Sequence, residues 1–222
     1  MWGPKRTILL ATLCSVTCLL GASRTQQATP ARAHPSRAEG VAAWQQMYSV
    51  LTHPRCLNCH TATNYPQQGD DRHRHQFNVL RGPEGRGVPG LTCATCHQGA
   101  TSKAPGGPNC AECHQGATLD ATGVPGGHGW HLAPFSMAWQ DRNDKRLSSA
   151  HVCRAITDRA RNQNMGGPEL LKHHDEAELV RYAWQPGKRP DGTARSVPPL
   201  THKQFVDATR RWAEAGMPCP QP

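Results

Sequence analysis

Three segments of the chain share one pattern of reactive side chains, in which two cysteines separated by two residues are followed at once by a histidine. They are Cys56–His60, Cys93–His97 and Cys110–His114. Two thiols at this spacing lie on one turn of the chain and can form thioether bonds with both vinyl groups of one porphyrin. The histidine that follows can then supply a nitrogen ligand to the iron. The pattern therefore predicts covalent attachment of c-type haem.

Each part of the pattern has its own role in this prediction. The thioether bonds are assigned to six cysteines, namely Cys56, Cys59, Cys93, Cys96, Cys110 and Cys113. The proximal iron ligands are His60, His97 and His114. Three haems are therefore expected. Two haems are the alternative, because residues 93–101 and 110–118 match at eight of nine positions, and a recent duplication can leave one copy without its cofactor.

Other interpretations of the cysteine pairs compete with haem attachment. A structural zinc site uses paired cysteines and histidine as ligands. A thioredoxin-like redox motif has a C-x-x-C pair within a βαβ context, and disulfide scaffolds are common in exported proteins. None of these requires a histidine directly after each second cysteine. Haem is therefore the favoured interpretation.

The second axial ligand of each iron decides what kind of chemistry follows. Iron with two strong protein ligands suits electron transfer, whereas an open position permits binding or catalysis. Our candidates for distal ligands are His75, His131 and then His53. The first two have aromatic and apolar neighbours in the sequence, which favours a buried ligand over a solvated side chain. His53 lies three residues before Cys56.

Two further cysteines, Cys153 and Cys219, have no partner at C-x-x-C spacing. In an oxidising compartment we expect them to form a disulfide that closes the C-terminal region. Two free thiols are the alternative.

The N-terminus has the features of a secretory signal peptide. Lys5 and Arg6 precede an apolar run over residues 7–22, which is short for a membrane span. We expect a signal peptide over residues 1–23, with cleavage as late as residue 33, and a flexible linker over residues 24–36. An uncleaved anchor is the alternative. The sequence therefore predicts a periplasmic protein with no stable membrane insertion after cleavage.

Composition limits the class of protein further. Among 222 residues, Gly (21) and Pro (19) are abundant, while aromatic residues make up only 5%, which is little material for a core. Bound porphyrins would fill part of the missing interior. The formal net charge of +9 arises from basic residues that stand singly or in pairs, usually near acids. Without a basic stripe or a recognition motif, a nucleic-acid partner is not expected.

The secondary structure expected around the motifs changes along the chain, from a helix before the first motif to loops after it. Val41, Trp44, Tyr48 and Leu51 recur at helical spacing just before the first motif, and this stripe could pack on the first porphyrin or on other side chains. Residues 61–130 are rich in Gly and Pro and lack a sustained period, which predicts loops around the haems.

Helices are expected after residue 141. Residues 148–162 read as one helix, and residues 168–184 as one or two. The clearest helix covers residues 201–215, with a capping box formed by Thr201 and Gln204 and an end at Gly216. Its predicted buried face consists of Phe205, Ala208 and Trp212.

These elements predict a mainly α fold with extensive irregular loops, of the multihaem c-type cytochrome kind. We expect one domain over residues 37–222. Its haem-binding part is residues 37–140, in which Gly/Pro-rich loops wrap the haems. Residues 141–222 form a helical C-terminal part that caps them.

Several short segments form a distinctive set, namely residues 53–60, 68–71, 81–85, 124–126, 130–134, 136–139 and 183–187. Together they resemble a family of small exported bacterial multihaem c-type cytochromes often labelled isoquinoline 1-oxidoreductase subunit. The resemblance implies haem chemistry, export and ligand roles for His75 and His131. The family usually has two haem motifs, so the third motif here is a departure. The label implies partnership with a molybdenum hydroxylase.

The expected function is that of a periplasmic triheme c-type cytochrome. It would transfer single electrons between a dehydrogenase and a downstream acceptor, as an electron carrier with a redox protein partner rather than as an enzyme. A molybdenum hydroxylase or another periplasmic dehydrogenase would fit that partner. One alternative is a haem enzyme that oxidises or reduces a small molecule at a five-coordinate iron, and another is a haem-based sensor or binding protein.

Overall fold

The computed structural model describes residues 3, 34–97, 129–186, 189 and 191–222. The expected signal peptide (1–23), most of the expected linker and the third motif with Cys110, Cys113 and His114 lie outside these residues. The chain divides into two units, Met1–Ala33 and His34–Pro222, and only the second is treated below. Its described residues are mostly helical with few, short strands, which confirms the mainly α class.

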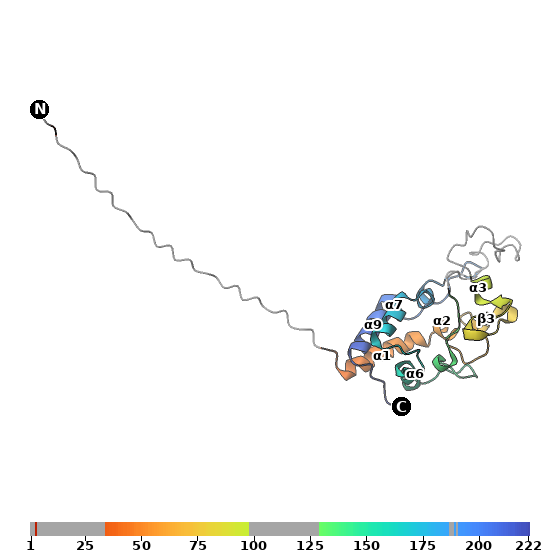
Figure 1. The fold of residues 1–222 in the computed structure, drawn as a ribbon, viewed down its shortest axis with the longest axis horizontal. Coiled ribbons are helices and arrows are strands. Elements are labelled where there is room, and N and C mark those ends of the chain that lie inside the picture. The colour runs from red at the N-terminus through yellow and green to blue at the C-terminus, as the bar shows by residue number, and fades with distance from the viewer. Residues whose placement is uncertain (1–2, 4–33, 98–128, 187–188, 190) are drawn as a thin grey trace. The chain divides into compact units, whose positions relative to one another are not determined.

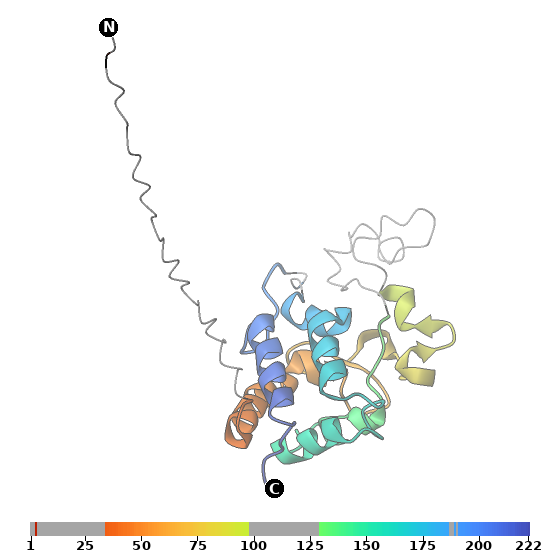
Figure 2. The same cartoon turned by 60° about the vertical axis from the view of Figure 1, so that its left-hand side comes forward.

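One group of helices, called the helical part below, contains the longer elements. It comprises α1 (Arg37–Leu51), α6 (Ser149–Thr157), α7 (Gly167–Glu176), α8 (Glu178–Arg181), the short 3₁₀ helix η4 (Tyr182–Trp184) and α9 (His202–Glu214). Helix α9 packs against both α1 and α7, as the orange and blue helices in Figures 1 and 2 show. None of the helices in the described ranges is both long and apolar enough to cross a bilayer.

The core of the helical part is aromatic. Trp44 of α1 and Trp212 of α9 are both 0% exposed, and their ring centroids lie 5.3 Å apart. The indole N–H of Trp44 donates to Ser149 at 2.9 Å, which joins α1 to α6. Of the two options for the stripe on α1, packing on other side chains is therefore the one that the structure shows.

The buried face of α1 differs from the predicted stripe. Met47 and Val50 are fully buried, whereas Val41 and Tyr48 are only partly buried. The buried face shares Trp44 and Leu51 with the predicted stripe and also includes Ala43.

Local signals set the ends of α9 as the sequence predicts. Thr201 accepts a hydrogen bond from the backbone of Gln204, and the Gln204 side chain accepts one from the Thr201 backbone. Gly216 follows the helix with a φ of +79°, which glycine adopts without the strain of a Cβ. The predicted face of Phe205, Ala208 and Trp212 is buried.

The helix predicted over residues 148–162 is shorter, because α6 ends at Thr157. The fully buried Asn162 explains the stop, since its side-chain amide donates to the carbonyls of Ile156 and Met165. These bonds hold the chain in a turn that a continuous helix would not allow.

The expected disulfide between Cys153 and Cys219 is present. It joins α6 to the C-terminal segment that follows α9.

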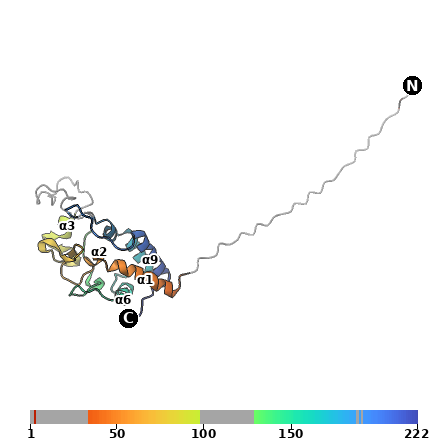
Figure 3. The same ribbon diagram turned by 180° about the vertical axis from the view of Figure 1, so that it is seen from behind.

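Residues 52–97 and 129–147 are called the loop part below. Its elements are short: α2 (Pro54–Leu57), β1 (Gln67–Gln68), β2 (His73–Arg74), η1 (Gln76–Asn78), η2 (Pro83–Gly85), β3 (Gly87–Val88), β4 (Leu91–Thr92), α3 (Cys93–Cys96) and η3 (Phe135–Met137). Strand β1 pairs antiparallel with β2, and β3 with β4. Figure 3 shows the yellow segments around α3 at the opposite end of this unit from α1 and α9. The prediction of loops for residues 61–130 agrees with the described residues 61–97, and residues 98–128 lie outside them.

A buried arginine ties the two stretches of the loop part together. The guanidinium of Arg81 donates to the carbonyls of Thr61 and Thr63 in the first stretch and of Ala133 in the second. The next residue, Gly82, has a positive φ, and a Cβ there would lie 1.8 Å from the carbonyl oxygen of Gly87. Only glycine allows this close approach of the backbone.

Candidate functional site

A cavity of about 530 Å³ is lined by residues of both described motifs. This volume falls in the range of small-molecule and cofactor sites, roughly 300–1,000 Å³. Cys59 of the first motif and Cys93, Cys96 and His97 of the second all line it. Segments on either side of the undescribed residues 98–128 therefore meet at one cavity.

His60 is held in a fixed orientation. Its ring stacks on Trp139 with centroids 3.5 Å apart and planes inclined by 9°, and its Nδ1 lies 2.8 Å from the carbonyl oxygen of Met137. Burial lowers the pKa of His60 to about 3, against the opposing effect of the hydrogen bond to Met137. The imidazole is therefore neutral at neutral pH, with Nδ1–H donating to Met137. This leaves Nε2 as the nitrogen with a lone pair, the arrangement in which a histidine binds a metal.

His97 lies among aromatic rings. It stacks on Trp130 with centroids 4.0 Å apart and planes inclined by 20°. The ring of Trp130 in turn meets Tyr182 edge-on at 4.9 Å. The second motif, in the loop part, is thus connected by ring contacts to the helical part.

The structure brings His75 next to His97. Their ring centroids are 5.9 Å apart with planes inclined by 65°, and both residues line the cavity. Nδ1 of His75 donates to the carbonyl of Gln76 at 2.9 Å, which again leaves Nε2 as the unprotonated nitrogen. Burial lowers the pKa of His75, so this ring too is neutral at neutral pH.

The other two distal candidates are placed differently. His131 lines the same cavity but is exposed, and its Nδ1 donates to the carbonyl of Gly129 at 2.6 Å. His53 does not line the cavity. It caps the N-terminus of α2, where its Nδ1 accepts from the backbone N–H of Arg55 at 3.2 Å.

The cysteines of the two described motifs are thiols, and none of these four forms a disulfide. Burial raises the pKa of Cys56 to about 12 and that of Cys59 to about 11. Burial also raises the pKa of Cys93. These sulfurs are therefore uncharged at neutral pH.

Within the described ranges, no three His, Cys, Asp or Glu side chains come together as a group that could hold a metal ion. A zinc site built from protein ligands alone would use four such side chains.

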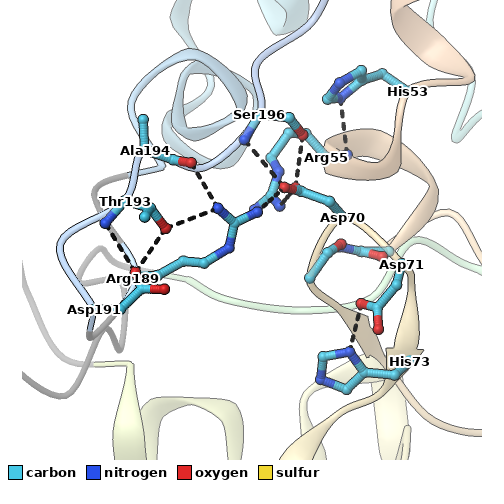
Figure 4. Close-up of polar contacts among 12 residues, drawn as sticks. His53, Arg55, Asp70, Asp71, His73, Arg189, Asp191, Thr193, Ala194 and Ser196 are labelled. Atoms are coloured by element: carbon cyan, nitrogen blue, oxygen red, sulfur yellow. Dashed lines mark hydrogen bonds and ion pairs between the residues drawn. The ribbon is translucent and has the colours of Figure 1, made fainter.

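Sequence reasoning missed a polar cluster at the cavity. Asp70 accepts hydrogen bonds from Arg55 and Arg189, and from the hydroxyl and backbone N–H of Ser196 (Figure 4). Burial acts to raise the pKa of Asp70, but the hydrogen bonds from Ser196 and Arg55 and the charge of Arg55 lower it to about 2. Arg55, Asp70, Arg189 and the nearby Arg195 all line the cavity. These residues are far apart in the sequence and form no motif.

Three buried side-chain atoms of the described residues have no hydrogen-bond partner: Arg55 Nε, Asn58 Oδ1 and Trp139 Nε1. Arg55 and Asn58 line the cavity. Trp139 is the residue that stacks on His60. Because buried polar atoms normally have partners, their position at the cavity and beside His60 suggests that a further group belongs there.

Comparisons with protein-family models, with curated proteins and with solved structures gave no match.

Proposed function

We propose that the protein is a periplasmic multihaem c-type cytochrome that carries single electrons between a redox protein and a downstream acceptor. The observation that carries this proposal is the pairing of His97 with His75 beside Cys93 and Cys96 in one cavity. Two cysteines for thioether bonds and two histidines as axial ligands are what a six-coordinate c-type haem uses.

The second motif lines the cavity with both cysteines and its histidine, whereas the first motif contributes Cys59. Cys56 and Cys59 would hold one haem with His60 as proximal ligand, and Cys93 and Cys96 a second with His97. Cys110, Cys113 and His114 would hold a third by the same pattern. Bound haem supplies reversible one-electron oxidation and reduction at its iron.

The protein's own contribution at the first motif is orientation of the ligand. The carbonyl of Met137 fixes the tautomer of His60, and Trp139 fixes the plane of its ring. A hydrogen bond at Nδ1 also increases the basicity of Nε2, which strengthens its bond to a metal. At the second motif Trp130 holds the ring of His97 in the same manner.

The thiols support haem over zinc. A protein-only zinc site needs about four ligands close together, and no three His, Cys, Asp or Glu side chains of the described residues form such a group. A thioether sulfur has no charge, so burying it needs no compensating cation.

The first experiment is the intact mass of the protein from a host that matures c-type haem. We expect a mass three haems above the cleaved polypeptide. The variant Cys93→Ser/Cys96→Ser should lose one haem, while Cys153→Ser/Cys219→Ser, which changes as many cysteines outside the motifs, should keep all three. Absence of covalent haem would overturn the proposal. A mass with two haems would mean that electrons pass through a pair of haems rather than three.

Spectroscopy then separates a carrier from a catalyst. We expect low-spin iron with two histidine ligands at the second motif, and His75→Ala should convert that haem to a high-spin form. His73→Ala, which changes a histidine two positions away, should leave it low-spin. A high-spin component in the unaltered protein would instead favour the haem enzyme at a five-coordinate iron.

A further inference from the structure

Three arginines, called the arginine cluster below, line the cavity beside one carboxylate. They are Arg55, Arg189 and Arg195, and the carboxylate is Asp70. Asp71 also lines the cavity but pairs with His73, with Nδ1 and the carboxylate oxygen 2.6 Å apart. The arginine cluster therefore gives the cavity an excess of positive charge. Such an excess favours an anionic group inside it.

Arg55 is the most enclosed member of the arginine cluster. Its side chain is only 3% exposed, one of its terminal nitrogens donates to Asp70, and its Nε has no partner among the described residues. Arg55 and Arg189 share the single carboxylate of Asp70, so the charge of one of the two guanidinium groups is left without a carboxylate of its own at the cavity.

Asp70 orients the side chains of two members of the arginine cluster. It holds Arg55 of α2 and Arg189 of the C-terminal region on the same carboxylate, and Ser196 donates to it as well. Arg189 is further held by Thr193 at 3.1 Å and by the carbonyl of Ala194 at 2.8 Å (Figure 4). The guanidinium groups of Arg55 and Arg189 are thus oriented before any ligand binds, which lowers the entropy lost on binding.

We propose that the arginine cluster binds a propionate carboxylate of the haem attached at Cys93 and Cys96, and thereby raises the reduction potential of that haem. This inference rests on the proposed function and assigns a further part of the same site. A guanidinium stays charged at all relevant pH values and matches a carboxylate with two parallel hydrogen bonds.

The positions of the side groups on the porphyrin indicate which haem would place its propionates at the arginine cluster. The vinyl groups and the propionates lie on opposite edges of the ring, so the carboxylates point away from the cysteines that attach it. Arg55 immediately precedes Cys56 of the first motif, and the cavity that it lines is also lined by Cys93, Cys96 and His97 of the second. A haem attached at Cys93 and Cys96 would therefore direct its propionates away from these two cysteines, towards the side of the cavity next to the first motif.

The effect on potential follows from charge. Reduction adds an electron to the haem, and a nearby cation stabilises the reduced form. Arg189→Gln removes one positive charge and should lower the equilibrium constant for reduction of the second haem by up to about tenfold, or about 59 mV for a one-electron couple. Arg189→Lys keeps the charge and should recover most of this loss. Arg195→Gln should lower the same potential, and it is an independent test if Arg189→Gln folds poorly.

The measurement is a potentiometric titration of the holoprotein followed by its visible spectrum. Arg210→Gln on α9 is the matched control, because it makes the same charge change at a residue that pairs with Asp207 and does not line the cavity. It should leave all potentials unchanged. In the Cys93→Ser/Cys96→Ser background, Arg189→Gln should shift the potentials of the remaining haems by less than it shifts the potential of the second haem.

Other outcomes separate this inference from the function on which it rests. Unchanged potentials in both Arg189→Gln and Arg195→Gln, with the full number of haems by mass, would overturn the inference and leave the cytochrome proposal intact. No covalent haem would overturn the function itself. A shift of the potential of the unaltered protein on adding acetate would show that the cluster takes an external carboxylate, which would also overturn the assignment to a propionate.

Discussion

The helical part and the loop part are built on different principles. In the helical part the largest buried side chains are apolar, with Trp44, Trp212 and Phe205 at its centre. In the loop part several of the buried side chains are polar, including Gln67, Gln140 and Arg81. They bond to one another or to backbone carbonyls, as when Gln140 donates to Gln67 at 2.6 Å. The hydrophobic core is thus centred on the helical part and takes in Leu57, Met137 and Trp139 of the loop part, which also surrounds the cavity.

The loop part also contains several residues with left-handed backbone conformations. In the loop part, Arg72, Phe77, Asn78 and Glu84 all adopt positive φ values although none is glycine. Each such residue raises the energy of the fold by about 1 kcal/mol or more. The exposed Phe77 lines the cavity in this conformation. A region with strained backbone and several buried polar side chains around a cavity would gain order from a bound group, and the proposed haems would supply it.

The largest difference between the loop part and the helical part is expected when the cofactor is withheld. In a chain with all four described motif cysteines changed to serine, we expect hydrogen exchange in the loop part to become about 100-fold faster or more, because ligand binding no longer stabilises it. Amides of α1 and α9 should keep most of their protection. The measurement is hydrogen exchange with mass spectrometry on both forms. Equal protection of residues 61–97 in the two forms would show that the loop part is ordered without haem.

The matching perturbation in the helical part is Trp212→Ala. Removing a fully buried indole that packs on Trp44 should lower the free energy of unfolding by about 3–5 kcal/mol. Urea unfolding monitored by circular dichroism measures this loss. Trp212→Phe, which keeps a ring but loses the hydrogen bond to the Pro218 carbonyl, should lose less. A loss below about 1 kcal/mol in Trp212→Ala would contradict a core centred on these two rings.

The sequence predicted the helical part well because its signals are local. The capping box at Thr201, the face ending at Trp212 and the stop at Gly216 all act within one helix. The predicted end of α6 at residue 162 was wrong, because the buried amide of Asn162 competes with the helix from outside it. No local pattern marks such a competitor.

The loop part was predicted only as loops, and its strands show why. Strands β1 to β4 have two residues each, too few for any alternation to emerge. At the site, His75 lies next to His97, and its role as a distal ligand stays a prediction. The cluster around Asp70 was missed because Arg189 joins it from 119 residues away, and only the tertiary fold brings them together.

Acid offers a smaller perturbation at the boundary between the two parts, where Asp70 joins Arg55 to Arg189. Interactions with Ser196 and Arg55 outweigh burial and lower the pKa of Asp70 from 3.8 to about 2. A lowered carboxylate pKa contributes stability that is fully present above about pH 4 and is lost as the pH falls through about 2. After allowance for partial exposure, this contribution is about 1–2 kcal/mol.

Comparison of the unaltered protein with Asp70→Asn isolates that contribution. The difference in unfolding free energy should be about 1–2 kcal/mol at pH 6 and should shrink steadily towards pH 2. Urea titrations at several pH values measure it. Ser196→Ala, which removes one hydrogen bond to the carboxylate, should give a smaller difference with the same pH dependence. A difference that grows in acid would mean that Asp70 is not stabilised as the carboxylate.

The smallest effect on the free energy of unfolding is expected at one helix end, the start of α9. Thr201→Ala removes the side-chain oxygen that accepts the backbone N–H of Gln204, which should lower the free energy of unfolding by about 1 kcal/mol. Thr201→Ser keeps the hydroxyl and should stay close to the unaltered protein. Hydrogen exchange should become faster at the start of α9 but not in residues 61–97, because the hydrophobic core is centred on the helical part. Faster exchange throughout the loop part would show instead that the two parts unfold as one cooperative unit.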